Sequence, residues 1–526
     1  MPIYSVIIRN ASVFDGAGSA PIKTDIAIDG DKINFIGDLS RESAREEIDA
    51  SNLYAAPGFI DITGHSDTHW TLFDEPSQES LVKQGVSTIL GGSCGSSLAP
   101  IVNAEDIENL QKRSDASTIN INWQTVQEFL DELKNHKLAL NFGTLVGHGT
   151  LRRASGMDVS REASPNELEK MAYLLSRALR EGALGISTSL GRSYALAADD
   201  NEVESLLFLI KKAGKLATHH LEDEGGGIVA AVSRIVSLSR ASGARSHISH
   251  FKVLGKKSWP QQKKALEIIE RAITGGMEIT ADFFPYTATG SDLYLLLPEW
   301  AIIGKQNEIL GRLSDADIRE KIINALKLMT LHYDKIIAAS TLKDTNVVGK
   351  SLEAAAKDAG LSPEEMIINL LIANNLQVSI FNEVISEENM LELASKDYTA
   401  ISSDGFGLGA GLKSPQNNLS HPRSFGAFPR ALRWLVKEKG VLSWEEAIRK
   451  MTSLPAKILG IEKRGQIKED FFADIVLFDP ETITDEADYK NPHRFSRGVE
   501  HLFINGQAVL SGGELTGERP GRVIMK

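Results

Sequence analysis

The sequence predicts an α/β protein built on a (β/α)₈ TIM-like barrel, with a small β-sandwich domain formed by both chain termini. Two patterns carry this prediction. The middle of the 526-residue chain alternates short apolar runs with long amphipathic stretches, as stacked strand–helix units do. Both ends instead hold short β-prone runs separated by turn residues. We therefore expect residues 1–57 and 465–526 to form the sandwich and residues 58–464 to form the barrel.

The two ends of the chain share one strand-and-turn pattern. Near the N-terminus the turns are Asp15-Gly16-Ala17-Gly18 and Asp29-Gly30-Asp31, and near the C-terminus the pair Asn505-Gly506 is a hairpin signal. The runs that we expect to be strands are Ser5–Asn10, Ile22–Asp29, Lys32–Ile36, Ala473–Phe478, Val499–Ile504 and Ala508–Leu510.

The middle of the chain supplies eight candidate strands, which is the number that a (β/α)₈ barrel requires. The intervals between most of them are amphipathic, as in Asn166–Glu181, Glu202–Ala213 and Ser258–Thr274. The interval from Tyr286 to Tyr398 is too long for one crossover helix, so we expect an inserted subdomain within residues 287–350. The candidate strands are Gly58–Ile62, Val86–Leu90, Leu138–Val146, Ala183–Ser187, Lys215–Thr218, Arg245–Ser249, Met277–Asp282 and Thr399–Ser402.

Composition excludes several classes of function. The formal net charge of −13 argues against a nucleic-acid surface, which needs clustered Lys and Arg. No apolar run reaches the ~18 residues of a membrane helix, and the N-terminus lacks the pattern of a secretory signal. With Cys94 as its one cysteine, the chain has no intrachain disulfide, which suits a reducing compartment. We expect a soluble cytoplasmic protein with no nucleic-acid or membrane partner, and the sequence leaves a homo-oligomer open.

Rare metal-binding side chains gather at the ends of the predicted strands. In such barrels the active site lies at the C-terminal ends of the strands. There the sequence places Cys94, His220 and His250, one thiol and two imidazoles, which together suit a catalytic Zn²⁺. Taken alone, a buried Cys or His is more often an ordinary core residue, so the prediction rests on the set. Asp404 stands at the eighth strand end as a candidate acid or base.

Many short motifs, in order along essentially the whole chain, resemble the N-acyl-D-amino-acid deacylase (D-aminoacylase) branch of the amidohydrolase superfamily. The resemblance implies a β-sandwich from both termini beside the barrel. It also implies zinc at Cys94, His220 and His250, with Asp404 as the catalytic acid and base. The motifs are Ala56-Pro57-Gly58-Phe59-Ile60-Asp61, His65-Ser66-Asp67, Cys94-Gly95-Ser96-Ser97, Gly147-His148-Gly149-Thr150, Ser249-His250-Phe251-Lys252, Asp282-Phe283-Phe284-Pro285-Tyr286, Leu297-Pro298-Glu299-Trp300, Ser403-Asp404-Gly405 and His421-Pro422-Arg423.

Three departures from the family pattern bear on the site. The first strand ends Thr63-Gly64-His65 where the superfamily has His-x-His, which favours one tightly bound Zn²⁺ and leaves His65 for a second, weak metal site or an oxyanion contact. The strand-five segment has Glu222 where the family has arginine. His219 stands beside His220, and because side chains alternate along a strand only one can point inward. The family register favours His220. The third departure is the segment Ser187–Asp199, which fits the family's Tyr-containing loop poorly, so we expect substrate specificity to change there.

The expected substrate is a small N-acyl amino acid, of the D series by resemblance. We expect Lys252 and Tyr286 to hold its carboxylate, with His148 and Ser291 as further substrate-binding candidates. One alternative is cyclic-amide hydrolysis, as in hydantoinases and dihydroorotases. It is disfavoured because the fourth strand ends Gly185-Ile186-Ser187-Thr188 without their metal-bridging lysine. The other alternative is a catalytically inactive scaffold.

Overall fold

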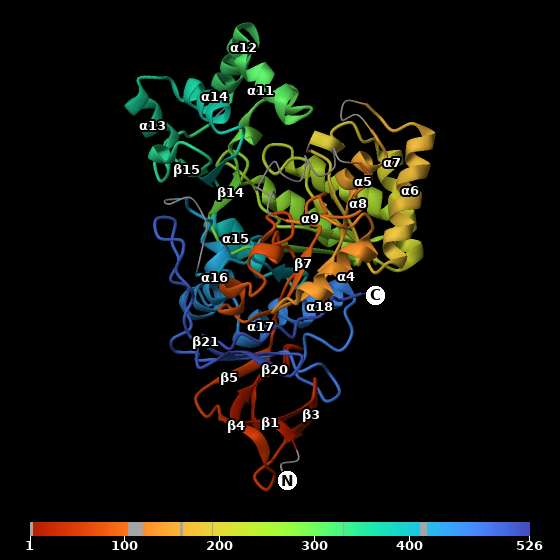
Figure 1. Cartoon of the computed structure of the whole chain (residues 1–526), viewed down its shortest axis with the longest axis vertical. Coiled ribbons are helices and arrows are strands. Elements are labelled where there is room, and N and C mark those ends of the chain that lie inside the picture. Colours follow the sequence, from red (N-terminus) through yellow and green to blue (C-terminus); the bar gives the residue numbers. More distant parts are fainter. Residues whose placement is uncertain are drawn as a thin grey trace.

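The computed structural model describes residues 4–103, 119–157, 161–191, 193–329, 331–410 and 418–525. Figure 1 shows three regions in line along the molecule. A β-sheet that holds the N-terminus lies at one end, the barrel lies in the middle, and a group of helices from α11 to α14 lies at the other end.

The barrel strands are parallel and lie at the eight predicted places along the chain, and one of the eight divides into two short strands. They run in two sets, β6-β7-β8 and β9-β10-β11-β12-β13-β17. The ring closes just beyond the strand ends, where Asp404 N–H donates to the Thr63 carbonyl at 2.9 Å and His65 N–H donates to the Gly405 carbonyl at 2.8 Å. The strands are β6 (Phe59–Asp61), β7 (Val86–Gly91), β8 (Asn141–Thr144), β9 (Val146–Gly147), β10 (Gly185–Ser189), β11 (Leu216–His220), β12 (Arg245–Ile248), β13 (Ile279–Phe283) and β17 (Thr399–Ile401).

The predicted third strand, Leu138–Val146, is wrong as one unit because it divides into β8 and β9. β8 pairs with β7 and β9 pairs with β10, so the chain changes partner at Leu145. Leu145 N–H still donates to the Gly91 carbonyl at 3.0 Å. The break turns the next residues into the short helix α5 (His148–Ala154).

Helices surround the barrel, and their starts follow ordinary capping chemistry. Thr125 and Ser164 each form a capping box, which supplies acceptors to the first free N–H groups of α4 and α6. The helix that we predicted to begin at Ser258 is α9, which begins three residues later, directly after Pro260. The helices are α1 (Thr71–Asp74), α2 (Glu79–Val82), α4 (Val126–His136), α6 (Pro165–Arg180), α7 (Asp200–Ala213), α8 (Ile228–Ser242), α9 (Gln261–Thr274), α15 (Glu387–Ala394), α16 (Arg423–Arg430), α17 (Trp444–Met451) and α18 (Ser453–Leu459).

Both chain termini contribute to one nine-stranded sheet, as the sequence predicts for a shared β-rich unit. β1 carries a bulge between Ile8 and Ala11, and it pairs with β4 before the bulge and with β5 after it. The two-layered sandwich stays a prediction. The strands are β1 (Tyr4–Val13), β2 (Ile22–Asp29), β3 (Lys32–Gly37), β4 (Ala44–Asp49), β5 (Tyr54–Pro57), β18 (Ile475–Phe478), β19 (Val499–Ile504), β20 (Gln507–Ser511) and β21 (Glu514–Leu515).

The chain segment between β13 and β17, where the sequence predicts an insertion, has a hydrophobic core of its own. Its buried side chains run from Leu293 to Ile380, which is past residue 350. A three-stranded sheet in the order β14-β16-β15 forms its base. Its elements are β14 (Ala288–Asp292), α10 (Glu299–Ile302), α11 (Gln306–Ser314), α12 (Ala316–Leu328), β15 (Ile336–Thr341), α13 (Leu352–Ala359), α14 (Pro363–Ala373) and β16 (Val378–Glu383).

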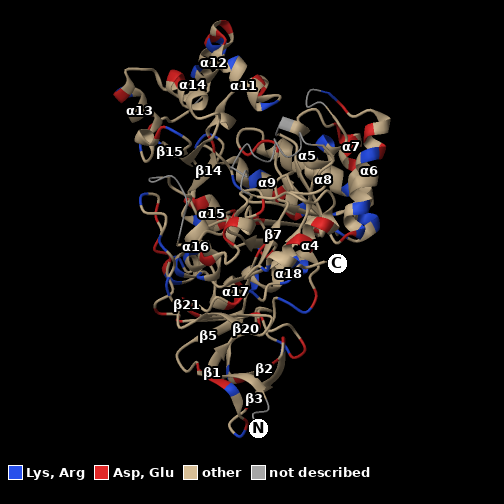
Figure 2. Ribbon diagram, viewed as in Figure 1, with Lys and Arg blue, Asp and Glu red and all other residues tan. Residues whose placement is uncertain are grey.

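Charged side chains of both signs are interspersed over the molecule, for example along α6 (Figure 2). In the part of the chain that the structure describes, no helix combines the length and the apolar character needed to cross a membrane.

Candidate metal centre and catalytic site

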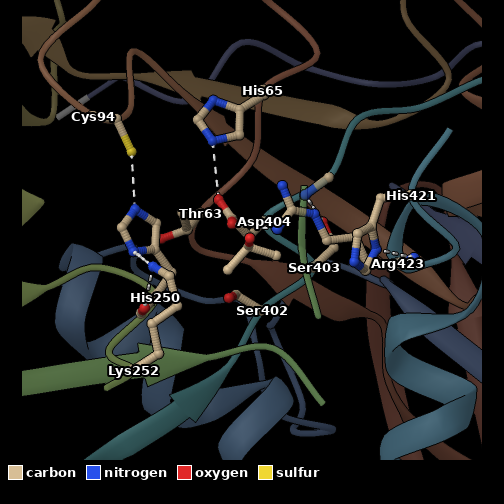
Figure 3. A network of polar contacts seen from close by, with 12 residues as sticks. Thr63, His65, Cys94, His250, Lys252, Ser402, Ser403, Asp404, His421 and Arg423 are labelled. Carbon is tan, nitrogen blue, oxygen red and sulfur yellow. Dashed lines mark hydrogen bonds and ion pairs between the residues drawn. The ribbon is translucent and has the colours of Figure 1, made fainter. Parts of the chain in front are cut away.

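Three potential metal ligands meet at the C-terminal mouth of the barrel. Cys94 follows β7, His220 ends β11, and His250 follows β12. One donor atom from each lies within 4.8 Å of the other two. His250 Nε2 is 3.2 Å from Cys94 Sγ and 2.8 Å from His220 Nδ1. The close-up in Figure 3 shows Cys94 and His250 directed at each other.

The structure distinguishes between the two adjacent histidines of β11. His220 faces His250, whereas His219 lies between the neighbouring strands, 2.8 Å from Thr188 Oγ1 and 3.2 Å from Ser246 Oγ. Burial, with His247 nearby, lowers the pKa of His219 to about 3, so this ring is neutral. The alternation of side chains along a strand therefore puts His220 in the candidate metal set.

The reactive residues share an unusual backbone conformation. Cys94, His250 and Asp404 have φ angles of 53°, 40° and 50°, in the left-handed region that residues other than glycine rarely adopt. Each such residue costs about 1–3 kcal/mol and persists only where its surroundings enforce it. The backbone thus stores strain at three of the positions to which the sequence assigns chemistry.

The thiol and imidazole form a charged pair. Removal from water opposes ionisation of Cys94, but the charges of His250 and His220 outweigh it and lower the pKa of the thiol well below its ordinary value. Burial and Lys252 oppose protonation of His250, but Cys94 and Asp404 raise its pKa to about 10. A thiolate is the form of cysteine that binds metal.

Asp404 is held by two cationic partners. Its Oδ1 lies 3.0 Å from His65 Nε2, and its Oδ2 accepts from Arg423 Nη1 at 2.6 Å (Figure 3). Burial raises the pKa of this carboxyl, yet Arg423, His250 and His65 together lower it well below its usual value. Asp404 is thus an ionised carboxylate at neutral pH. The sequence reasoning did not single out Arg423, although its His421-Pro422-Arg423 motif was noted.

Lys252 lies against the metal set. Its Nζ lies 2.5 Å from Glu224 Oε1, 3.0 Å from His250 Nδ1 and 3.1 Å from the His250 carbonyl. Arg423 Cζ and Lys252 Nζ lie 4.9 Å and 5.9 Å from the centre of the Phe284 ring. Two cations therefore share one aromatic ring beside the reactive groups. The sequence reasoning also missed Glu224, which no spacing rule distinguishes from its acidic neighbours.

The other predicted site residues have partners outside the metal set. Tyr286 donates to the Pro422 carbonyl at 3.3 Å, and the Arg430 guanidinium lies over its ring. Ser291 belongs to β14 in the insertion. His148 is fully buried, with Nε2 2.6 Å from Glu202 Oε1. For these three residues, a role in binding substrate stays a prediction.

The residues present fit a zinc ion. One thiolate and two imidazoles are the sulfur and nitrogen donors that Zn²⁺ prefers, and three protein ligands leave a position for water. His65, our candidate for a weak second metal site or an oxyanion contact, has its Nε2 directed at Asp404. Among the described residues, the side chains whose donor atoms are close enough to share one metal ion are Cys94, His220 and His250, and His65 is outside this group.

The fold and the site together define a class, that of metal-dependent hydrolases built on a parallel barrel. The model of the Amidohydrolase family matches residues 419–510. N-acyl-D-aspartate deacylase from Alcaligenes xylosoxydans xylosoxydans is 30% identical, over 98% of this chain and 94% of its own. D-aminoacylase from the same organism is 29% identical, over 99% and 98%.

A solved structure points the same way. N-acyl-D-glutamate deacylase from Bordetella bronchiseptica, complexed with zinc and a phosphonate inhibitor, has a TM-score of 0.84 at 26% identity and covers 99% of this chain and 100% of its own. The chain belongs to the D-aminoacylase and N-acyl-D-amino-acid deacylase family of amidohydrolases.

Proposed function

We propose that this chain is a zinc-dependent deacylase that converts N-acyl-D-amino acids to a carboxylate and a free D-amino acid. One observation carries the proposal: the donor atoms of Cys94, His220 and His250 converge within 4.8 Å at the barrel mouth that also holds Asp404. The handedness of the substrate rests on the named activities of the relatives. We also propose domain limits at residues 1–57 with 465–526 for the sheet and 58–464 for the barrel.

Cys94, His220 and His250 would hold one tightly bound zinc ion. Such an ion supplies an acidified water and polarises the carbonyl of the scissile amide. The chain's own contribution is to keep these ligands in their metal-binding forms. The thiol is already ionised, whereas His250 must lose a proton when metal binds.

Asp404 moves the proton. Its carboxylate is ionised at neutral pH, so it can accept a proton from the attacking water and pass it to the nitrogen of the leaving amine. His65 and Arg423 fix the orientation of its two oxygens. Amine expulsion requires that proton, because a deprotonated amine is a poor leaving group.

The substrate carboxylate would lie between Lys252 and Arg423. Both cations lie near the Phe284 ring, next to the metal set and to Asp404. Among the described residues, Nη1 is the one guanidinium nitrogen of Arg423 with a hydrogen-bond acceptor, so other N–H groups of this side chain remain for an anion. Charge-assisted contacts of this kind fix the orientation of a ligand.

Cyclic-amide hydrolysis is not favoured. β10 (Gly185–Ser189) contains no lysine to bridge two metals, and the two Alcaligenes relatives are named as an aminoacylase and an N-acyl-D-aspartate deacylase. The gathered ligands and the ionised Asp404 likewise disfavour an inactive scaffold.

A hydrolysis screen tests the proposal. Zinc-loaded full-length protein is assayed with N-acetyl amino acids of both hands, with hydantoins and dihydroorotate as competing substrates. We expect turnover of N-acetyl-D-amino acids. Faster hydrolysis of the L forms, or turnover of cyclic amides alone, would overturn the substrate assignment. Asp404→Asn, prepared in the same way, controls for contaminating hydrolases.

A further inference from the structure

Beneath the metal set lies a carboxylate that the proposed chemistry does not use. Asp282, in β13, is fully buried. Its Oδ1 accepts from the backbone N–H of His250 at 3.0 Å and from Ser402 Oγ at 2.6 Å. Its Oδ2 accepts from Thr63 Oγ1 at 2.8 Å and lies 2.7 Å from His247 Nε2. Both oxygens therefore hold neighbouring strand ends, and one holds the left-handed backbone of a metal ligand.

A second buried carboxylate holds the backbone around Asp404. Asp61, the last residue of β6, accepts from Ser403 N–H at 2.9 Å and also from the Ser403 hydroxyl. The same hydroxyl accepts from Gly405 N–H at 2.9 Å. The residues on both sides of Asp404 are thus tied, directly or through one hydroxyl, to Asp61. Figure 3 shows Ser402 and Ser403 below Asp404 in this view.

The two carboxylates differ in which reactive residue's backbone they support most directly, although Asp282 also accepts from Ser402 and Thr63 on the acid side. Asp282 contacts the backbone of His250, on the metal side, and Asp61 contacts the residue before Asp404, on the acid side. His250 and Asp404 both adopt the left-handed conformation that only close support can maintain.

We propose that Asp282 and Asp61 are separate positioning residues, which hold the backbones of His250 and Asp404 respectively. This inference rests on the proposed function, because it assigns His250 to metal binding and Asp404 to proton transfer. Asp282 then determines how tightly the chain binds zinc. Asp61 determines how fast the zinc-loaded enzyme turns over.

The competing explanation is that both carboxylates only join strands of the barrel. In that case each substitution lowers thermal stability and impairs zinc binding and turnover together. A general loss of packing cannot lower zinc affinity in one variant and kcat in the other.

The experiment compares Asp282→Ala with Asp61→Ala in the full-length protein. Zinc affinity is measured by competition with a chromogenic chelator, and kcat is measured at saturating zinc. We expect Asp282→Ala to weaken zinc binding by about 10–100-fold, the usual effect of losing support behind a ligand, and Asp61→Ala to change it by less than about threefold. Asp61→Ala should instead lower kcat by about 10–100-fold, because a small misplacement of the reactive group is costly.

Thr280→Val is the matched control. Thr280 Oγ1 lies 2.8 Å from His247 Nδ1, so this variant disturbs the same network without touching the His250 backbone. We expect its zinc affinity to match that of the unsubstituted protein. Where an alanine variant does not fold, Asp282→Asn and Asp61→Asn give the same comparison with smaller changes.

The two proposals fail in distinguishable ways. Unsubstituted protein that binds no zinc or hydrolyses no N-acyl amino acid contradicts the proposed function. If that protein does both, the positioning roles are overturned by two results: equal losses of zinc affinity and kcat in the two aspartate variants, or weakened zinc binding in Thr280→Val.

Discussion

The metal side and the acid side of the site differ in how their reactive atoms are partnered. On the metal side, the donor atoms of Cys94, His220 and His250 face one another across a few ångströms. On the acid side, both oxygens of Asp404 already have cationic partners, His65 and Arg423. One side is arranged to receive an ion, and the other holds a fixed charge in place.

This difference shows how each side obtains its reactivity. The metal ligands keep each other in charged forms, with the thiol pKa lowered by two imidazoles and the pKa of His250 raised to about 10 by the thiolate and Asp404 against burial. Asp404 is also buried, and Arg423, His250 and His65 lower its pKa, so that it stays ionised. Removing a metal ligand should therefore abolish zinc binding, whereas removing an acid-side residue should slow turnover without loss of zinc.

Loss of Cys94 should have the largest effect. Cys94→Ala removes the one thiolate of the set, so we expect the zinc content to fall from about one ion per chain to a small fraction of that, and turnover to fall below detection. Metal analysis of the purified protein measures this. Ser93→Ala, one residue away, should keep its zinc. Full zinc content in Cys94→Ala, or two firmly bound ions in the unsubstituted protein, would contradict a single site built on Cys94.

Asp404→Asn should separate the two sides most clearly. The amide cannot accept the proton, so we expect kcat to fall by about 10²–10⁴-fold, the usual contribution of general acid–base catalysis. Zinc content should not change, because Asp404 is outside the metal set. Metal analysis and steady-state kinetics on one preparation check both. Near-normal turnover would mean that another group moves the proton.

The metal side could be predicted from the sequence because its residue types are rare. The chain has one cysteine and 12 histidines, so their occurrence at the ends of predicted strands two, five and six is informative without a structure. The order of barrel strands could also be predicted, since apolar runs and helices alternate. The division of the predicted third strand into β8 and β9 could not be predicted. The change of partner at Leu145 depends on β7 and β10, which are far away in the chain.

The acid side could be predicted only in part. Asp404 could be identified from its place at a strand end. Arg423 donates to it from the start of α16, and no periodic pattern in the sequence predicts that these two residues meet. Asp61 and Asp282 stand in two of the motifs that carry the resemblance, but their roles could not be predicted, because they depend on hydrogen bonds to Ser403 and His250 that only the fold reveals.

The smallest expected effect concerns the two cations beside Phe284. If both hold the substrate carboxylate, Lys252→Met and Arg423→Met should each raise KM for a free N-acyl amino acid by about 10–100-fold, the value of a charge-assisted hydrogen bond. Their effects on the methyl ester should be much smaller, because the ester carries no charge. If a substitution raised KM equally for the acid and the ester, the substituted residue would not bind the substrate carboxylate.

The pH profile separates the two cations. Burial raises the pKa of Asp404 and Arg423 lowers it, so Arg423→Met should raise that pKa. The carboxylate would then be protonated at a higher pH, and the acidic limb of kcat/KM should move upward. Lys252 forms its hydrogen bonds with Glu224 and His250, and the causes that lower the pKa of Asp404 are Arg423, His250 and His65, so Lys252→Met should leave that limb in place. An equal shift in both variants would mean that the limb reports the charge of the whole pocket, and an unshifted limb in Arg423→Met would mean that Asp404 is not the group that titrates there.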